Sequence, residues 1–203
     1  MEAKQQKQDS FDETQTIQVI KEMIYVSQKK LKNDGILFIL WGWIMFYNYI
    51  SSFVLRNTLT TFQIKKGFEF LGIGLGVFAF AFSIYYIIRN SKKVTTYIGI
   101  SLRYVWVSLV ICLSLTNIIL FRGLQEFNPE LQHPIFMLFI SFAIVTTGGI
   151  LRYKLIIIGG IIFGILAFIC SYLNIDWQML CEAVAWLIAF IIPGHYLYAK
   201  RKS

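Results

Sequence analysis

The fold is decided by two apolar runs and the short basic break between them: IFMLFISFAIVTTGGIL (135–151), RYK (152–154) and LIIIGGIIFGILAFICSYL (155–173). A single helix through both runs would be far longer than the hydrocarbon core of a bilayer, which is about 30 Å thick. Gly148 and Gly149 also weaken the helix just before the break. One continuous helix is the alternative, but the pattern favours two transmembrane helices joined as a tight hairpin.

Similar apolar runs fill the chain on both sides of this hairpin. A helix of about 20 apolar residues crosses a bilayer, and 57% of the residues are hydrophobic while only 15% are charged. A soluble domain carries about 25% charged residues. We therefore predict an all-α integral membrane bundle over residues 35–198, with six transmembrane helices at 35–55, 67–88, 97–121, 135–151, 155–173 and 177–198.

The basic residues indicate the orientation of the bundle, because Lys and Arg collect in the cytoplasmic loops of membrane proteins. Four basic groups fall on the same side of the predicted spans: Lys29, Lys30 and Lys32; Arg89, Lys92 and Lys93; Arg152 and Lys154; and the tail 199–203. The connection with Arg56, Lys65 and Lys66 is discordant. We expect cytoplasmic N- and C-termini.

Residues 1–34 form a predicted cytoplasmic segment of different character. Ser10 and Glu13 match a capping box, which predicts the start of a helix. Apolar side chains then recur at helical spacing, so an amphipathic helix is expected over about residues 11–32. Its polar face mixes acids with lysines, which favours a protein partner over the lipid surface.

Small residues inside the spans predict close helix contacts. Gly72, Gly76, Ala79 and Ser83 make a stripe along the second span, and Gly160 and Gly164 make another in the fifth. Such stripes let neighbouring backbones approach closely. We expect these contacts mainly within the bundle rather than at a dimer face, and the sequence leaves the oligomeric state open.

Glu182 is the strongest candidate for a functional group, because ionisable side chains at membrane depth are costly. It lies in the predicted outer half of the sixth span. Asn48 and Asn117 fall at a similar depth, and Glu69 is at the outer end of the second span. This intramembrane polar site would suit a proton or a cation. The structural alternative is a hydrogen bond from Glu182 to a neighbouring helix.

Two further candidates lie near the cytoplasmic interface. His195 follows Pro193 and Gly194, where the sixth span is expected to kink or end. It is either a proton-responsive group or a side chain that bonds a backbone carbonyl. Arg103 suits a side chain that extends to the lipid headgroups. His133 precedes Pro134 in the predicted outer loop and is a weaker candidate.

Several classes of function have little support. The net charge of +8 is spread over the ends of apolar spans rather than gathered on one face, so we expect no nucleic-acid binding. Cys112, Cys170 and Cys181 lack the paired spacing of a zinc or CxxC site and are expected to be inert. Two histidines without an HExxH motif argue against a metalloprotease. We expect no enzyme, cofactor or metal.

Four strings carry a resemblance to a known family: LWGW (40–43), YVW (104–106), GGILRYK (148–154) leading to IGG (158–160), and IPGH (192–195). Together they resemble an uncharacterised family of small polytopic inner-membrane proteins common in Bacteroidetes. The resemblance extends from the amphipathic segment to the C-terminus. It implies a bacterial inner-membrane location, and it implies no activity, substrate or cofactor.

The sequence therefore favours a membrane-embedded partner-binding or regulatory component in contact with the lipid bilayer. Its small loops leave no room for a soluble catalytic domain. The alternative is a small-solute or ion transporter that uses Glu182 with Asn48 and Asn117.

Overall fold

The computed structural model describes residues 18, 35–58, 62–91, 97–125 and 128–202. Throughout these ranges the chain is helical apart from short connections, which confirms the all-α prediction. The predicted amphipathic helix 11–32 lies outside the described residues except for Gln18. The elements are α2 (Gly35–Asn57), α3 (Phe62–Ser91), α4 (Tyr97–Leu124), α5 (Pro129–Leu151), α6 (Lys154–Cys170), α7 (Ile175–Trp186), the π-helical turn η2 (Leu187–Ile191) and α8 (Ile192–Lys202).

The helices have the length and composition of a membrane-embedded protein. Within the described part of the chain, five continuous helical stretches are long and apolar enough to cross a bilayer, the last of them running from α7 through α8. The apolar helix α6 has 17 residues, or about 25 Å at 1.5 Å per residue. The outer faces of α3 and α4 expose large apolar side chains such as Phe70 and Ile119. Exposed apolar surface of this extent suits contact with lipid.

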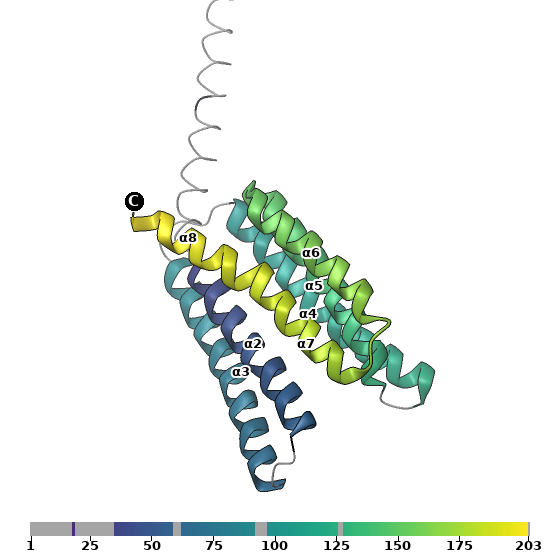
Figure 1. Ribbon diagram of the computed structural model, residues 1–203. Coiled ribbons are helices and arrows are strands. Elements are labelled where there is room, and N and C mark those ends of the chain that lie inside the picture. The colour runs from purple at the N-terminus through teal and green to yellow at the C-terminus, as the bar shows by residue number, and fades with distance from the viewer. Residues whose placement is uncertain (1–17, 19–34, 59–61, 92–96, 126–127, 203) are drawn as a thin grey trace, which may run out of the picture.

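The C-terminal helix occupies the centre of the bundle. Its three parts, α7, η2 and α8, follow one another along a single path (Figure 1) and contact both α2 and α6. Helix α3 packs on α2, and α4 packs on α5, which forms a hairpin with α6. In the core, the ring of Phe190 lies 5.3 Å from Phe38, 6.3 Å from Trp106 and 4.4 Å from Trp186, measured between ring centroids.

Glycines allow the central helix to pack closely on its neighbours. A Cβ atom on Gly42 of α2 would lie 2.8 Å from Ile191 Cγ1, and one on Gly194 of α8 would lie 3.0 Å from the backbone nitrogen of Ile39. Neither position has room for a side chain. Gly72 likewise faces Asn48, and Ser83 accepts a hydrogen bond of 3.0 Å from Trp41 Nε1. The small residues at 72 and 83 therefore pack within the bundle, whereas Gly76 faces open space.

The turn between α5 and α6 is tight because Arg152 adopts the left-handed conformation, with φ of 51° and ψ of 45°. Its backbone N–H and that of Tyr153 bond the carbonyls of Gly149 and Gly148 at 3.1 and 2.9 Å. These bonds satisfy carbonyls that the end of α5 leaves free. Two antiparallel helices separated by a basic turn are thus observed at residues 129–170.

The helices extend beyond several of the predicted spans. Helix α5 begins at Pro129 rather than at residue 135, because the Asn128 side chain accepts the Leu131 N–H at 3.2 Å and caps the helix in a polar segment. Hydropathy marks where apolar residues start, not where the hydrogen-bond ladder starts. Likewise, α3 covers residues 62–91 rather than 67–88.

The last span is predicted to kink or end at Pro193, and it does not end there, since the helix continues to Lys202. Proline has no N–H to give the carbonyl four residues earlier, and its ring crowds that carbonyl. The π-helical turn η2 ends two residues before Pro193, and the Ile192 N–H bonds the carbonyl of Leu187. A wider turn accommodates the proline without breaking the helix.

The hairpin geometry predicts opposite outcomes for two glycine-to-alanine variants. A Cβ on Gly160 would lie 2.9 Å from the backbone nitrogen of Val145, whereas one on Gly149 meets nothing within 4 Å. Gly160→Ala should destabilise the protein by about 1–3 kcal/mol through overpacking, and it should lower the melting temperature in detergent. Gly149→Ala is the control and should melt at or slightly above the wild-type temperature. Equal melting temperatures for the wild type and Gly160→Ala would contradict this packing.

Candidate functional site

The candidate site is built around Glu182 in the second half of α7. Gln178 lies one turn before it and Trp186 one turn after it, so all three lie on the same face of the helix. That face is turned into the bundle, and all three side chains are buried. Only 2% of the Glu182 side chain is exposed. A buried carboxyl group needs hydrogen-bond partners to offset the cost of removing it from water.

The partners of Glu182 come from two other helices. His133 of α5 places Nδ1 3.0 Å from Glu182 Oε2. Tyr49 of α2 lies next to the same carboxyl group, and the rings of Tyr49 and His133 meet edge to face at 6.1 Å. We call Glu182, His133 and Tyr49 the acid–histidine centre.

The acid–histidine centre can hold a proton in two arrangements. A carboxylate accepts a hydrogen bond from a protonated imidazole, and a neutral carboxyl group can donate one to a neutral imidazole. In both arrangements the contact between His133 and Glu182 is satisfied. His133 is also the more accessible partner, with 23% of its side chain exposed against 2% for Glu182. A proton therefore reaches the buried acid most directly through the imidazole.

Gln178 fastens the end of the bundle next to this centre. Its amide nitrogen donates to the carbonyls of Glu130 and Leu173 at 2.9 Å and of Cys170 at 3.1 Å. These carbonyls belong to the start of α5, the end of α6 and the turn before α7. The Gln178 side chain thus connects three segments of the chain. These bonds hold the start of α5, which carries His133, against α7, which carries Glu182.

The other predicted members of the polar site have different partners. Asn117 of α4 accepts a hydrogen bond of 2.7 Å from Gln132. Asn48 of α2 packs against Gly72. Glu69 is exposed on α3. The structure therefore replaces the expected asparagine neighbours of Glu182 with a histidine and a tyrosine.

The sequence makes His133 only a weak candidate and does not indicate Tyr49, for reasons that the local structure explains. His133 precedes the apolar run that starts at residue 135, so hydropathy predicts a loop there. In fact Pro134 lies inside α5, and His133 is in the opening turns of that helix. The available signal was the Asn128-Pro129 pair, an N-cap followed by proline at the first helical position. Tyr49 lies inside an apolar run, and nothing in the surrounding sequence indicates a functional role for it.

The cytoplasmic-interface candidates are separate from this centre. His195 bonds the carbonyl of Ile191 through Nδ1 at 2.9 Å, and its ring meets the edge of Trp43 at 6.3 Å. This is the backbone-bonding role that was the structural alternative for His195. Arg103 is exposed on α4, as a side chain that extends along the bundle surface would be.

The discordant connection at the predicted outer side is partly explained by an ion pair. Arg56, at the end of α2, bonds the carboxylate of Asp176 at the start of α7. This contact joins two chain segments at the end of the bundle nearest Glu182. Among the described residues, no group of three or more His, Cys, Asp or Glu side chains has a geometry that would hold a metal ion.

Coupling between His133 and Glu182 should be measurable in a double-mutant cycle. His133→Leu leaves the buried acid without its imidazole, so it should cost more stability in the wild type than in a Glu182→Gln background. We expect a coupling free energy of about 0.5–3 kcal/mol from denaturation in detergent micelles. His195→Leu paired with Glu182→Gln is the control and should be additive. Additive effects of His133→Leu and Glu182→Gln would contradict the contact.

A scan against protein-family models and searches of curated proteins and of solved structures gave no match to the chain.

Proposed function

We propose that the chain is a multi-pass membrane protein that takes up and releases a proton at Glu182, as part of the transport of a small solute or ion. The observation that carries this proposal is the buried pair of Glu182 and His133, with Nδ1 and Oε2 3.0 Å apart. Intramembrane pairs of ionisable groups are typical of proton pathways in transporters and pumps.

The depth and exposure of the pair support this function. Glu182 is seven residues into α7, which corresponds to about 10 Å along the helix. His133 is four residues from the start of α5, or about 6 Å, and is the more exposed of the two. This arrangement gives the buried acid access to one side of the membrane through the imidazole. Tyr49 supplies a hydroxyl that can donate a hydrogen bond to the ionised carboxylate or accept one from the protonated carboxyl group.

The proposed setting is a bacterial inner membrane with six spans and both termini in the cytoplasm. α6, the shortest of the six spans, is about 25 Å long, with Lys154 and Ser171 at its ends, and crosses the membrane with the help of these flanking residues. The basic turn at Arg152 and the tail after Ala199 then share the cytoplasmic side. The resemblance to the Bacteroidetes family supports the same location, and no catalytic role is proposed.

Reporter fusions test this topology. Alkaline phosphatase fused after Asn128 should be active, because the proposed topology places that residue outside the cytoplasm. Green fluorescent protein fused after Ser203 should be fluorescent, because it folds in the cytoplasm. The exchanged fusions serve as controls and should be silent. An active phosphatase at Ser203 would overturn the orientation.

Proton movement through the purified protein tests the function. In liposomes that contain a pH-sensitive dye, a potassium diffusion potential should drive proton entry when the wild-type protein is present. Glu182→Gln should reduce this flux to the level of empty liposomes, since the amide cannot exchange a proton.

Glu69→Gln is the matched control for that experiment. It makes the same chemical change at an exposed carboxyl group of α3 and should keep the wild-type flux. Equal flux in the wild type and in Glu182→Gln, or no flux in the wild type, would contradict the proposal.

A partner-binding or regulatory component is the second candidate. Its support is the amphipathic pattern of residues 11–32, in which acids and lysines share the polar face. That pattern suits a protein surface better than anionic lipid. The two functions are compatible, because a partner on the cytoplasmic segment can respond to the protonation of Glu182.

A further inference from the structure

Two of the three cysteines meet at the seam between α6 and α7. Cys170 is the last residue of α6 and is buried, and Cys181 lies in α7 with partial exposure. Their side chains approach each other across this seam. The sequence spacing gave no hint of this contact, because the turn of residues 171–174 reverses the chain between the two positions.

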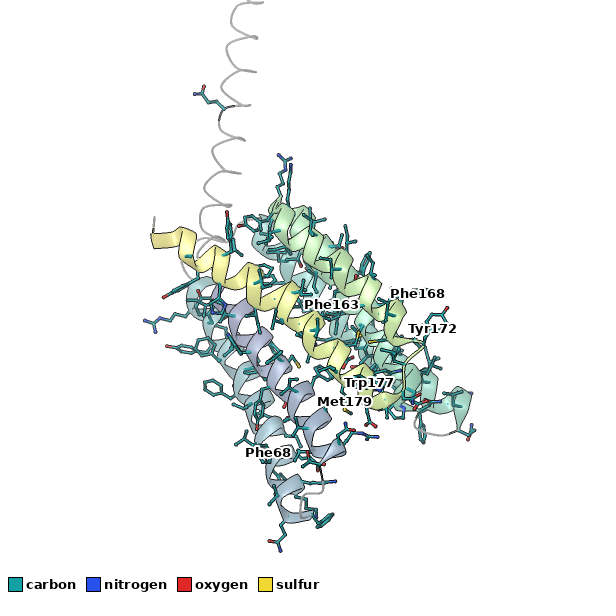
Figure 2. The ribbon with its side chains drawn as sticks, viewed as in Figure 1. Phe68, Phe163, Phe168, Tyr172, Trp177 and Met179 are labelled. Atoms are coloured by element: carbon teal, nitrogen blue, oxygen red, sulfur yellow. The ribbon has the colours of Figure 1, made fainter. Side chains whose placement is uncertain are left out.

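The backbone contacts of each thiol place both at the same level of the seam. Cys170 Sγ lies 3.9 Å from the carbonyl oxygen of Gln178, which is three residues before Cys181. Cys181 Sγ lies 3.6 Å from the carbonyl oxygen of Leu166, one turn before Cys170. Each sulfur thus crosses to the helix that carries the other. Figure 2 shows this region, with Phe168 and Tyr172 at the end of α6 and Trp177 and Met179 near the start of α7.

We propose that Cys170 and Cys181 form a dithiol–disulfide site. Each sulfur already contacts the helix that carries the other, so the two need only a short approach to reach an S–S bond length of about 2.05 Å. In the reaction, the two thiols lose two protons and two electrons and form one disulfide bond. The oxidant is another disulfide, from a small molecule or a protein, which is reduced to two thiols.

Exposure assigns the order of the two steps. Cys181 is partly exposed, so its thiolate attacks the incoming disulfide, releases one thiol and forms a mixed disulfide. The buried Cys170 then attacks the Cys181 sulfur as a thiolate and releases the second thiol of the oxidant. Cys112 is exposed on α4 and has no part in this chemistry.

The disulfide would fasten the end of α6 to α7 immediately beside Glu182. It would close the loop between residues 170 and 181, which includes Gln178 with its contacts to three backbone carbonyls. Under the topology proposed above, this end of the bundle lies on the outer side, where disulfides persist. The pairing itself depends only on the contact between the thiols and not on proton exchange at Glu182.

Intact-protein mass spectrometry after treatment with 4,4′-dithiodipyridine tests the proposal. The experiment uses a Cys112→Ser background, which leaves only the pair, and starts from protein reduced and kept folded in detergent. We expect the protein to lose the mass of two hydrogens and to retain no thiopyridine. Two free thiols, or one thiopyridine on each cysteine, would overturn the proposal.

Single-cysteine variants test the order of the steps. With Cys170→Ser added, Cys181 should keep one thiopyridine, because no second thiol displaces it. With Cys181→Ser added, Cys170 should react many-fold more slowly, because it is buried. Faster labelling of Cys170 than of Cys181 would overturn the assigned order. Glu182→Gln should form the same disulfide, so the outcome is separable from that of the proton-flux experiment.

Discussion

The close approach of the C-terminal helix to its neighbours is the constraint on which the rest of the bundle depends. In a membrane, lipid is as apolar as leucine, so helices associate through tight packing rather than through exclusion of water. Gly42 of α2 and Gly194 of α8 provide that packing between α2 and the C-terminal helix. A Cβ atom on Gly42 would collide with Ile191, and one on Gly194 would collide with Ile39. This short separation lets a tyrosine of α2 reach a carboxyl group of α7.

The same contacts explain three strings of the sequence: LWGW (40–43), YVW (104–106) and IPGH (192–195). LWGW and IPGH are separated by most of the sequence, yet they lie against each other. Gly42 faces Ile191, Gly194 faces Ile39, and the ring of Trp43 meets that of His195 at 6.3 Å. Trp106 of the YVW string contacts Phe190. These strings therefore pack a part of the bundle away from Glu182, and their residues serve the fold.

Sequence patterns predicted the elements of this protein better than the contacts between them. Apolar runs and a basic break were enough for helical spans and for a turn at Arg152, because both depend on local composition. Predicting His133 as the partner of Glu182 would have required knowing where α5 begins. Asn128 sets that start by capping the helix in a polar segment. The approach of Cys170 and Cys181 results from the chain reversal between α6 and α7. Long-range pairings of this kind leave no periodic signal in one sequence.

The buried acid is the feature that packing alone does not explain. An apolar pair of similar volume is often as stabilising as a buried ion pair, because the charges lose their hydration. Glu182 and His133 therefore add little that leucines would not add to the packing of α5 on α7. What leucines lack is a proton that can be carried either by His133 Nδ1 or by Glu182 Oε2, two atoms that lie 3.0 Å apart. The partial exposure of His133 connects that proton to the surface, and this connection distinguishes an exchanging pair from a sealed one.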